Sequence, residues 1–403
     1  MDLYTLTDTF LSKDVIDEFV SAIWTERYYS AGDVQLVVPA TPSNIEKLAP
    51  GTFLALRGTK EVMYLHTQSI EERLMTVVGS SLLEFLNNRL VWFKNPDYSP
   101  SDENSPKIVD FTLGGVNAKK PGEFISYVVD KMTIHPVPMT GTGYTDFQNV
   151  VNLDWPFGVI EHLELGDTDI SGTAKRLTIP IGPLYEGIVH LAQQEGVGLS
   201  LYLDSATIIE GYVLKFKTYR GVDHTTGSAY PLVRLLPDMD SLSDLKEVRS
   251  NADYKNVVYI WYKGKLYTRY AEPTLPKPEG FARRVMVTDA EGAPVGRKVT
   301  VSRGTTFWQT YEVVGTAEIE AFIDQNAKDA LANHNYIRAI DGQTSPHNDY
   351  KYGVDYGLGD VIELKGITGL ITKSRVTEYI RSQDKSGERE YPTISVINPE
   401  AGT

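Results

Sequence analysis

The chain has 403 residues and carries 39 Lys and Arg against 53 Asp and Glu, a formal net charge of −14. A chain of this length is expected to form about two to four domains, and its 41% hydrophobic content is typical of globular proteins. The acidic balance argues against a nucleic-acid-binding surface, although an acidic wall would let nucleic acid pass without adhering to it. The absence of cysteine excludes disulfides, thiolate nucleophiles and Cys-based zinc sites.

The N-terminal segment MDLYTLTDTFLSKDVIDEF has early acidic residues and no basic region before an apolar core, so it does not resemble a secretory signal. No apolar run approaches the ~18 residues that a membrane helix needs. We therefore expect a protein that is made in a cytoplasm and has no stable membrane insertion.

Short β-prone segments separated by turns dominate the first 90 residues. The alternation of apolar and polar residues predicts strands over 15–24, 34–38, 52–57, 61–67 and 72–78. A helix is expected over 79–88, with Ser80 as its N-cap. The Pro-, Ser- and Asp-rich segment 95–106 then indicates a loop or domain boundary.

The rest of the chain mixes helices with further strands. Helical spacing of apolar residues predicts helices over 123–132, 184–195 and 317–333, and Gly196 is a candidate C-cap for the second of them. We expect strands over 198–204, 208–219 and 256–262, two or three more over 356–397, and a polar connection over 238–251. The pattern predicts a β-rich, multidomain α+β protein whose sheets are closed or packed against each other.

Sequence motifs of common catalytic, nucleotide and metal sites are absent, so we expect no catalytic residues, no cofactor and no metal. The segment 167–172 (DTDISG) begins like a calcium loop, but Thr178 stands where that loop needs a bidentate Glu, and a simple turn is favoured. The seven histidines are too far apart in sequence to form a local metal pair: His66, His135, His162, His190, His224, His334 and His347.

Two other functions are kept as alternatives. A cell-wall or carbohydrate-active hydrolase would need paired carboxylates, for which Glu161 and Glu164, or the cluster Asp238, Asp240 and Asp244, are the candidates. A carbohydrate-binding module would use exposed aromatic rings such as Trp155 or Trp261. The 24 tyrosines are more typical of half-buried sheet positions and oligomer interfaces.

Three separated segments carry a family resemblance. The first runs through a strand, Y-S-x-G-D, a strand ending in P-A-T, a hairpin and V-x-G-S-S-L-x-x-x-L-x-x-R. Its matching residues are Tyr29, Ser30, Gly32, Asp33, Pro39, Leu54, Leu56, Gly79, Ser80, Leu82, Leu86 and Arg89. The second segment is 254–259 with Asn256, and the third is 355–361 with Asp355, Tyr356, Gly359 and Asp360. Together they resemble siphophage minor tail proteins of the tail-tip baseplate hub family, which is similar to the contractile-tail hub.

The resemblance implies two tail-tube-type β-barrel domains with inserted helix-containing α/β domains. The implied division is a first barrel over 1–110, with Arg89 and Trp92 near its closing helix, and an α+β domain over 111–198. A second barrel would combine 199–262 with 350–403, and 263–349 would be a helix-containing insertion.

The resemblance also implies a structural role in the virion rather than an enzyme. Three copies would form a ring at the tail tip, after assembly in the host cytoplasm. The implied partners are further copies of the chain, the distal tail or tail tube protein, other tail-tip or fibre proteins and the tape measure protein, with DNA passing only transiently through the lumen. The chain ends soon after its final expected strands, so receptor-binding or wall-degrading extensions are not expected.

Overall fold

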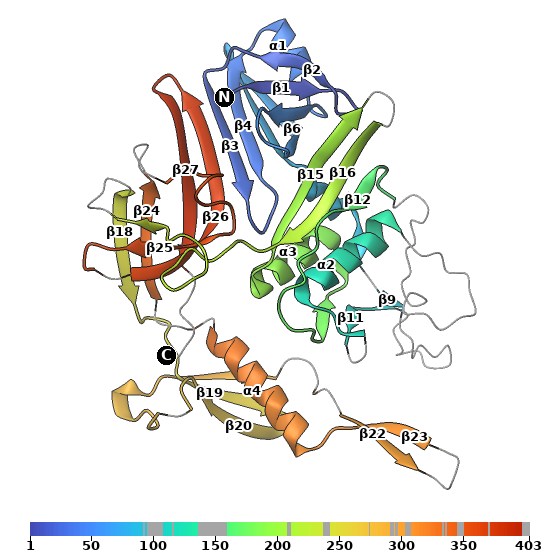
Figure 1. Ribbon diagram of the computed structural model, residues 1–403, viewed down its shortest axis with the longest axis vertical. Coiled ribbons are helices and arrows are strands. Elements are labelled where there is room, and N and C mark those ends of the chain that lie inside the picture. Colours follow the sequence, from blue (N-terminus) through green and yellow to red (C-terminus); the bar gives the residue numbers. More distant parts are fainter. Residues whose placement is uncertain are drawn as a thin grey trace. The chain divides into compact units, whose positions relative to one another are not determined.

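The computed structural model describes residues 1–91, 93–94, 108–114, 117–135, 159–207, 211–236, 242–273, 275–290, 294, 297–302, 308–332, 334, 337–344, 350–369 and 371–396. It is β-rich with few helices, as the sequence predicted (Figure 1). The chain forms two compact units. Unit 1 consists of Met1–Ser243, Gln343–Glu363 and Ser374–Ser395, and unit 2 consists of Asp244–Gly342, Leu364–Lys373 and Val396–Thr403.

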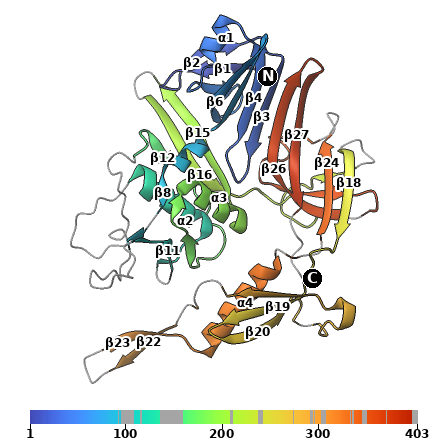
Figure 2. The ribbon, with the colours of Figure 1, turned by 180° about the vertical axis from the view of Figure 1, so that it is seen from behind.

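The main sheet joins strands from the two ends of the chain. It contains β1 (Leu3–Leu6), β2 (Ser12–Ile16), β3 (Ser21–Arg27), β4 (Asp33–Pro39), β5 (Phe53–Leu56), β6 (Val62–Glu71), β7 (Leu74–Ser81), β17 (Arg234–Leu235), β25 (Val361–Lys365), β26 (Ile371–Asp384) and β27 (Gly387–Val396). The strand order is β17-β25-β26-β3-β4-β7-β6-β5-β1-β2, and β27 pairs with β26. Antiparallel pairing of β26 with β3 places Glu378 opposite Arg27, so the C-terminal strands continue the N-terminal sheet (Figure 2).

Alternation along the N-terminal strands explains how this sheet forms its core. In β4, Val34, Leu36 and Val38 are buried while Gln35 is exposed, because successive side chains of a strand point to opposite faces. The buried residues pack with Trp24 of β3 and with apolar side chains of β5, β6 and β7. A short helix, α1 (Pro42–Lys47), begins at the N-cap Thr41, whose side chain accepts a hydrogen bond from the N–H of Asn44.

A helical layer completes unit 1. It contains the 3₁₀ helix η1 (Leu82–Asn88), α2 (Pro121–Val129), the π-helix η3 (Asp130–Ile134) and α3 (Leu184–Glu195). These helices share one apolar core with the three-stranded sheet of β12 (Leu163–Leu165), β16 (Gly211–Tyr219) and β15 (Gly198–Thr207). The short strand pairs beside them are β8 (Leu90–Val91) with β14 (Gly182–Pro183), β9 (Phe93–Lys94) with β10 (Ile108–Val109), and β11 (Phe111–Leu113) with β13 (Leu177–Ile179).

Unit 2 is built around a three-stranded sheet, β20 (Lys265–Tyr270), β19 (Val257–Tyr262) and β21 (Val285–Asp289). The helix α4 (Thr316–Ala332) packs on it, and Val258 and Ile260 meet Ile323, Ala327 and Leu331 in its core. The remaining elements are the pair β18 (Leu242–Ser250) and β24 (Ile337–Thr344), the pair β22 (Arg297–Ser302) and β23 (Trp308–Val313), and the 3₁₀ helix η5 (Gly280–Ala282). No helix among the described residues is long and apolar enough to cross a membrane.

The helix predicted over 184–195 is confirmed as α3, and Gly196 ends it in the left-handed conformation with φ of 65°. The helix predicted over 79–88 is wrong at its start: residues 79–81 complete β7, and Ser80 pairs with Asp33 of β4 instead of capping a helix. The strand predicted over 15–24 is two strands, β2 and β3, and the predicted polar connection over 238–251 contains β18. Trp92 and the segment 95–106 lie outside the described residues.

We expect Leu36→Ala to destabilise the main sheet by roughly 2–5 kcal/mol, because it removes a fully buried side chain from a central strand and leaves a cavity. Urea unfolding followed by tryptophan fluorescence measures this, since Trp24 lies in the same core. Gln35→Ala, one residue away on the exposed face, is the matched control and should shift the midpoint little. Equal shifts for the two variants would contradict the assigned faces.

Candidate functional site

A junction in unit 1 is centred on Tyr28, in the turn between β3 and β4. The Tyr28 side chain is fully buried, and its hydroxyl donates to the carbonyl oxygens of Gly196 and Tyr219, both 3.2 Å away. Its N–H donates to the carbonyl of Thr377 on β26 at 2.8 Å, and its carbonyl accepts from the N–H of Leu199 on β15 at 2.8 Å. One residue therefore connects three segments that are far apart in the sequence.

Glycines make room for the Tyr28 ring. A Cβ on Gly198 or on Gly359 would lie 2.2 Å from Cε2 of Tyr28, which is well inside van der Waals contact. A Cβ on Gly221 would lie 2.1 Å from the carbonyl carbon of Gly359. Gly359 also has φ of +93°, a conformation that L side chains rarely adopt. We call Gly198, Gly221 and Gly359 the glycine cradle.

Asp360 holds the loop that presents Gly359. Its carboxylate accepts from the N–H of Val222 at 2.7 Å and from the N–H of Gly357 at 2.6 Å, and it lies 3.4 Å from Nε2 of His224. Because the carboxylate bonds to backbone on both sides, it joins the loop 357–360 to the segment that follows β16.

Two arginines connect β26 to the turn. Arg375 donates from Nη1 to the carbonyl of Gly359 at 2.7 Å, and its guanidinium lies 5.3 Å from the centre of the Tyr28 ring. Arg27 donates to Glu378 at 2.8 Å and to the carbonyl of Ala31 at 2.9 Å, and it also forms an ion pair with Asp33. These charge-assisted contacts lie around the buried ring and restrain the turn.

An aromatic stack extends the junction along β26. The rings of Tyr352 and Tyr379 are parallel within 7°, with centroids 3.4 Å apart. Arg381 lies over both rings and bonds to Glu26 of β3 at 2.7 Å, while the Tyr379 hydroxyl donates to Glu390 at 2.9 Å. The stack holds the loop at Tyr352 against β26.

Glu61 is an acidic group inside the same junction. Its carboxylate lies against Gly32: a Cβ added to that glycine would be 3.1 Å from both carboxylate oxygens of Glu61. Burial raises the pKa of Glu61 to about 8, and repulsion from Glu26 adds to the rise, while hydrogen bonds from Ser81 and the Gly32 N–H oppose it. The carboxyl group is therefore mostly protonated at neutral pH.

The family-motif residues named from the sequence lie in three parts of the structure. The junction contains Tyr29, which packs edge-to-face on Tyr28, together with Ser30, Gly32, Asp33, Tyr356, Gly359 and Asp360. Asp355 lies in the same loop and accepts from the N–H of Lys351. Gly79 and Ser80 pair with the start of β4, Leu82 enters the helical core, and Arg89 is the C-cap of η1. Asn256 lies in unit 2, where its side chain bonds to the backbone of Arg284 and Ala282.

Sequence reasoning missed Tyr28, Glu61 and Arg375 as parts of this site. Tyr28 directly precedes the selected Tyr29, and the doubled tyrosine before Y-S-x-G-D was the available signal. Glu61 and Arg375 gave no local signal, because their partners lie on other strands.

Those candidates for catalysis and metal binding that the structure describes are not assembled into a site, and Asp238, Asp240, Trp155 and His347 lie outside the described residues. Glu161 and Glu164 are both exposed, on either side of the buried Leu163. Asp169 forms an ion pair with Arg220 at 2.9 Å and accepts a hydrogen bond from the N–H of Ser171 at 3.0 Å, so its carboxylate stabilises a turn over 167–172. Within the described part of the chain, no group of three His, Asp or Glu residues could hold a metal ion.

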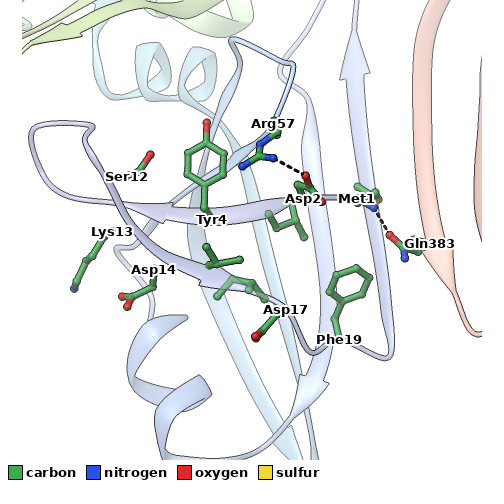
Figure 3. A pocket seen from close by; sticks show the side chains of 13 residues that line it. Met1, Asp2, Tyr4, Ser12, Lys13, Asp14, Asp17, Phe19, Arg57 and Gln383 are labelled. Atoms are coloured by element: carbon green, nitrogen blue, oxygen red, sulfur yellow. Dashed lines mark hydrogen bonds and ion pairs between the residues drawn. The ribbon is translucent and has the colours of Figure 1, made fainter.

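A groove of about 730 Å³ runs along the hairpin of β1 and β2 (Figure 3). Its side chains point in different directions around the strands, with Ser12 and Lys13 on one side and Phe19 and Gln383 on the other. Asp2 is already paired with Arg57 at 3.2 Å. The arrangement does not direct reactive groups toward one centre.

We expect Gly359→Ala to destabilise unit 1 by roughly 2–5 kcal/mol, because the new Cβ is strained at positive φ and collides with the Tyr28 ring. Thermal unfolding followed by circular dichroism measures the loss. Gly357→Ala is the matched control in the same loop, since its Cβ would meet only Asp360 Oδ2 at an ordinary 3.7 Å. Similar losses for both variants would refute the cradle.

We expect Glu61→Gln to stabilise the protein at pH 8.5 and to have little effect at pH 4.5. The folded carboxyl keeps its proton up to about pH 8, whereas the unfolded one releases it near 4.5, so wild-type stability falls as the pH rises between these values. The shift sets an upper limit of about 5 kcal/mol on the gain. Melting temperatures at the two pH values test this. Glu46→Gln, at an exposed position of α1, is the control, and a pH-independent effect of Glu61→Gln would contradict the assignment.

Comparisons with known proteins show the family of the chain and the solved structures that it resembles. Residues 2–102 and 159–394 match the model of the family described as Siphovirus ReqiPepy6 Gp37-like protein. No protein in the curated comparison matches the sequence. Among solved structures, the 43 kDa tail protein of prophage MuSo2 from Shewanella oneidensis is similar over 100% of this chain and 99% of its own, with TM-score 0.54 and 13% identity. A tail protein from Neisseria meningitidis MC58 is similar over 99% of this chain and 96% of its own, with TM-score 0.51 and 11% identity. Because the family model matches most of the chain, the protein belongs to the Siphovirus ReqiPepy6 Gp37-like family, and its fold is similar to that of these two tail proteins.

Proposed function

We propose that the protein is a homotrimeric tail-tip hub that joins the tail tube or distal tail ring to distal fibre or spike proteins. In this proposal three copies form a ring around the channel through which DNA leaves, and the tape measure protein ends at the same ring. The protein is a structural part of the virion, takes no cofactor and catalyses no reaction. Membership of a family of phage tail proteins supports this role.

The observation that carries the proposal is the segregation of charge between the two units. Unit 1 has 23 Lys and Arg against 39 Asp and Glu, a net −16, and unit 2 has 16 against 14, a net +2. The whole acidic excess therefore lies in one compact body. A channel wall for DNA needs negative charge, because a wall that binds phosphate would hold the strand in place. We assign the channel wall to unit 1.

The sheet and the junction suit a wall segment. Strand β26 continues the N-terminal sheet through β3, and Tyr28 connects that sheet to β15 and to the loop of Gly359. Such cross-connection makes the acidic unit stiff.

Our proposal keeps the division into a first barrel over 1–110, an α+β domain over 111–198, a second barrel over 199–262 with 350–403, and an insertion over 263–349. Two similar barrels in each of three copies would match the six-fold symmetry of a tail tube.

Light scattering on the purified chain tests the proposal. We expect a species of three times the 44.9 kDa chain mass, and ring-shaped particles by electron microscopy, either alone or after addition of the distal tail protein. The ring should form because each copy presents complementary surfaces that close after three. A chain that stays monomeric at high concentration, with and without that partner, would refute the hub. Cleared bands in a zymogram of host cell walls would favour the hydrolase instead.

A further inference from the structure

Among the described residues, a helix covers one face of the three-stranded sheet of unit 2. Val258, Ile260 and Tyr262 of β19 point toward α4, as do Tyr267 of β20 and Met286 of β21. Figure 1 shows α4 lying along β19 and β20. The helix also anchors the sheet through ion pairs of Arg269. Because successive side chains of a strand point to opposite faces, the residues next to these in each strand point to the face away from α4.

The opposite face is apolar and aromatic. By strand register, Tyr259 of β19 lies between Thr268 and Val287, and Trp261 lies between Leu266 and Asp289. Trp261 is 46% exposed, Leu266 43% and Val287 60%. We call Tyr259, Trp261, Leu266, Thr268, Val287 and Asp289 the open face. Exposed apolar groups gathered on one sheet face are typical of an interaction surface.

The connection between β20 and β21 adds to this surface. Phe281, in η5, is fully exposed, and Leu275 is 57% exposed. Two cations of the same connection contact tyrosines of the sheet: Lys277 is 5.6 Å from the centre of the Tyr270 ring, and Arg283 donates to the Tyr259 hydroxyl at 2.9 Å. The surface thus combines apolar side chains with charges of both signs, since Asp289 of the open face and the exposed Glu272 and Glu279 of the connection are acidic.

The chemistry of the open face favours a protein over a sugar. A sugar stacked on Trp261 would need hydroxyl partners around the ring, but of its two cross-strand neighbours only Asp289 could accept a hydrogen bond, while Leu266 offers none. Leu266, Val287 and Phe281 offer no hydrogen bonds, so their exposure is relieved only by another apolar surface.

The net charges of the two units favour one kind of contact between copies of the chain. Between two copies of this chain, contact of unit 1 with unit 1 would bring two bodies of −16 together, and contact of unit 2 with unit 2 would bring together two bodies of +2. Only unit 2 against unit 1 joins opposite signs. Lys277 and Arg283 lie beside the open face, where they offset the negative charge of Asp289 within it.

We propose that the open face docks on the acidic unit 1 of a second copy of this chain. The proposal rests on the proposed homotrimer and specifies one of its contacts. Such a contact is heterologous, because different surfaces of the two copies meet, and heterologous contacts close into rings when the rotation permits.

Site-specific cross-linking tests the contact, since the chain has no cysteine of its own. Phe281→Cys labelled with benzophenone maleimide is mixed as light and ¹⁵N-labelled full-length chains and irradiated, and cross-linked peptides are identified by mass spectrometry. We expect links between light and heavy chains that join position 281 to unit 1. Lys328→Cys, at an exposed position of α4, is the control and should link to unit 1 of another chain at least tenfold less. Links confined to single chains, or equal yields for both variants, would overturn the contact.

A second measurement uses negative charge placed on the open face and on the connection beside it. Val287→Glu and Phe281→Glu change exposed side chains, so the fold of the monomer should be retained, and circular dichroism checks this. We expect at least a tenfold higher dissociation constant for the oligomer by sedimentation, compared with Gln325→Glu on the exposed side of α4. An oligomer that forms normally with Glu at 281 and 287 would overturn this contact while leaving the hub intact. A wild-type chain that never associates, with or without the distal tail protein, would refute both proposals.

Discussion

The fit of one buried tyrosine ring against glycines determines how the ends of this chain come together. Tyr28 belongs to the N-terminal sheet, Gly198 begins β15, and Gly359 belongs to a loop more than three hundred residues away from Tyr28. The ring fits only because both glycines lack a Cβ, so no side-chain rearrangement could replace this packing. The pairing of β26 with β3 and the bonds of Arg375 depend on the same placement.

Charged side chains around this ring make the stability of the junction depend on pH. Arg27 pairs with Asp33 and Glu378, Arg381 pairs with Glu26, and Arg375 donates to the Gly359 carbonyl, so most ionised groups there have a partner. Glu61 is different, because it lies near Glu26 and keeps its proton at neutral pH. The contribution of Glu61 to stability should therefore fall as the pH rises from about 4.5 to about 8, whereas below pH 4.5 its carboxyl is neutral in both the folded and the unfolded chain.

Local patterns in the sequence predicted local structure well. The helix over 184–195 has a complete apolar stripe and a glycine at its end, and both signals act within the helix. The helix predicted from Ser80 failed because that residue pairs with Asp33 of β4, a contact that a local capping pattern does not contain. The two motifs at 29–33 and 355–360 were selected separately, and their meeting around Tyr28 depends on contacts that sequence spacing does not encode.

The distribution of charge links the fold to assembly. A chain with a net charge of −14 repels its own copies, so the proposed ring of copies needs contacts that oppose this repulsion. Confining the acidic excess to unit 1 leaves unit 2 nearly neutral, and a nearly neutral body can expose Trp261 and Val287 toward an acidic neighbour without an electrostatic penalty. The same segregation that suits unit 1 to the proposed DNA channel therefore also makes unit 2 the better surface for the proposed contact between copies. Both properties depend on one feature of the chain, which is where its acidic residues lie.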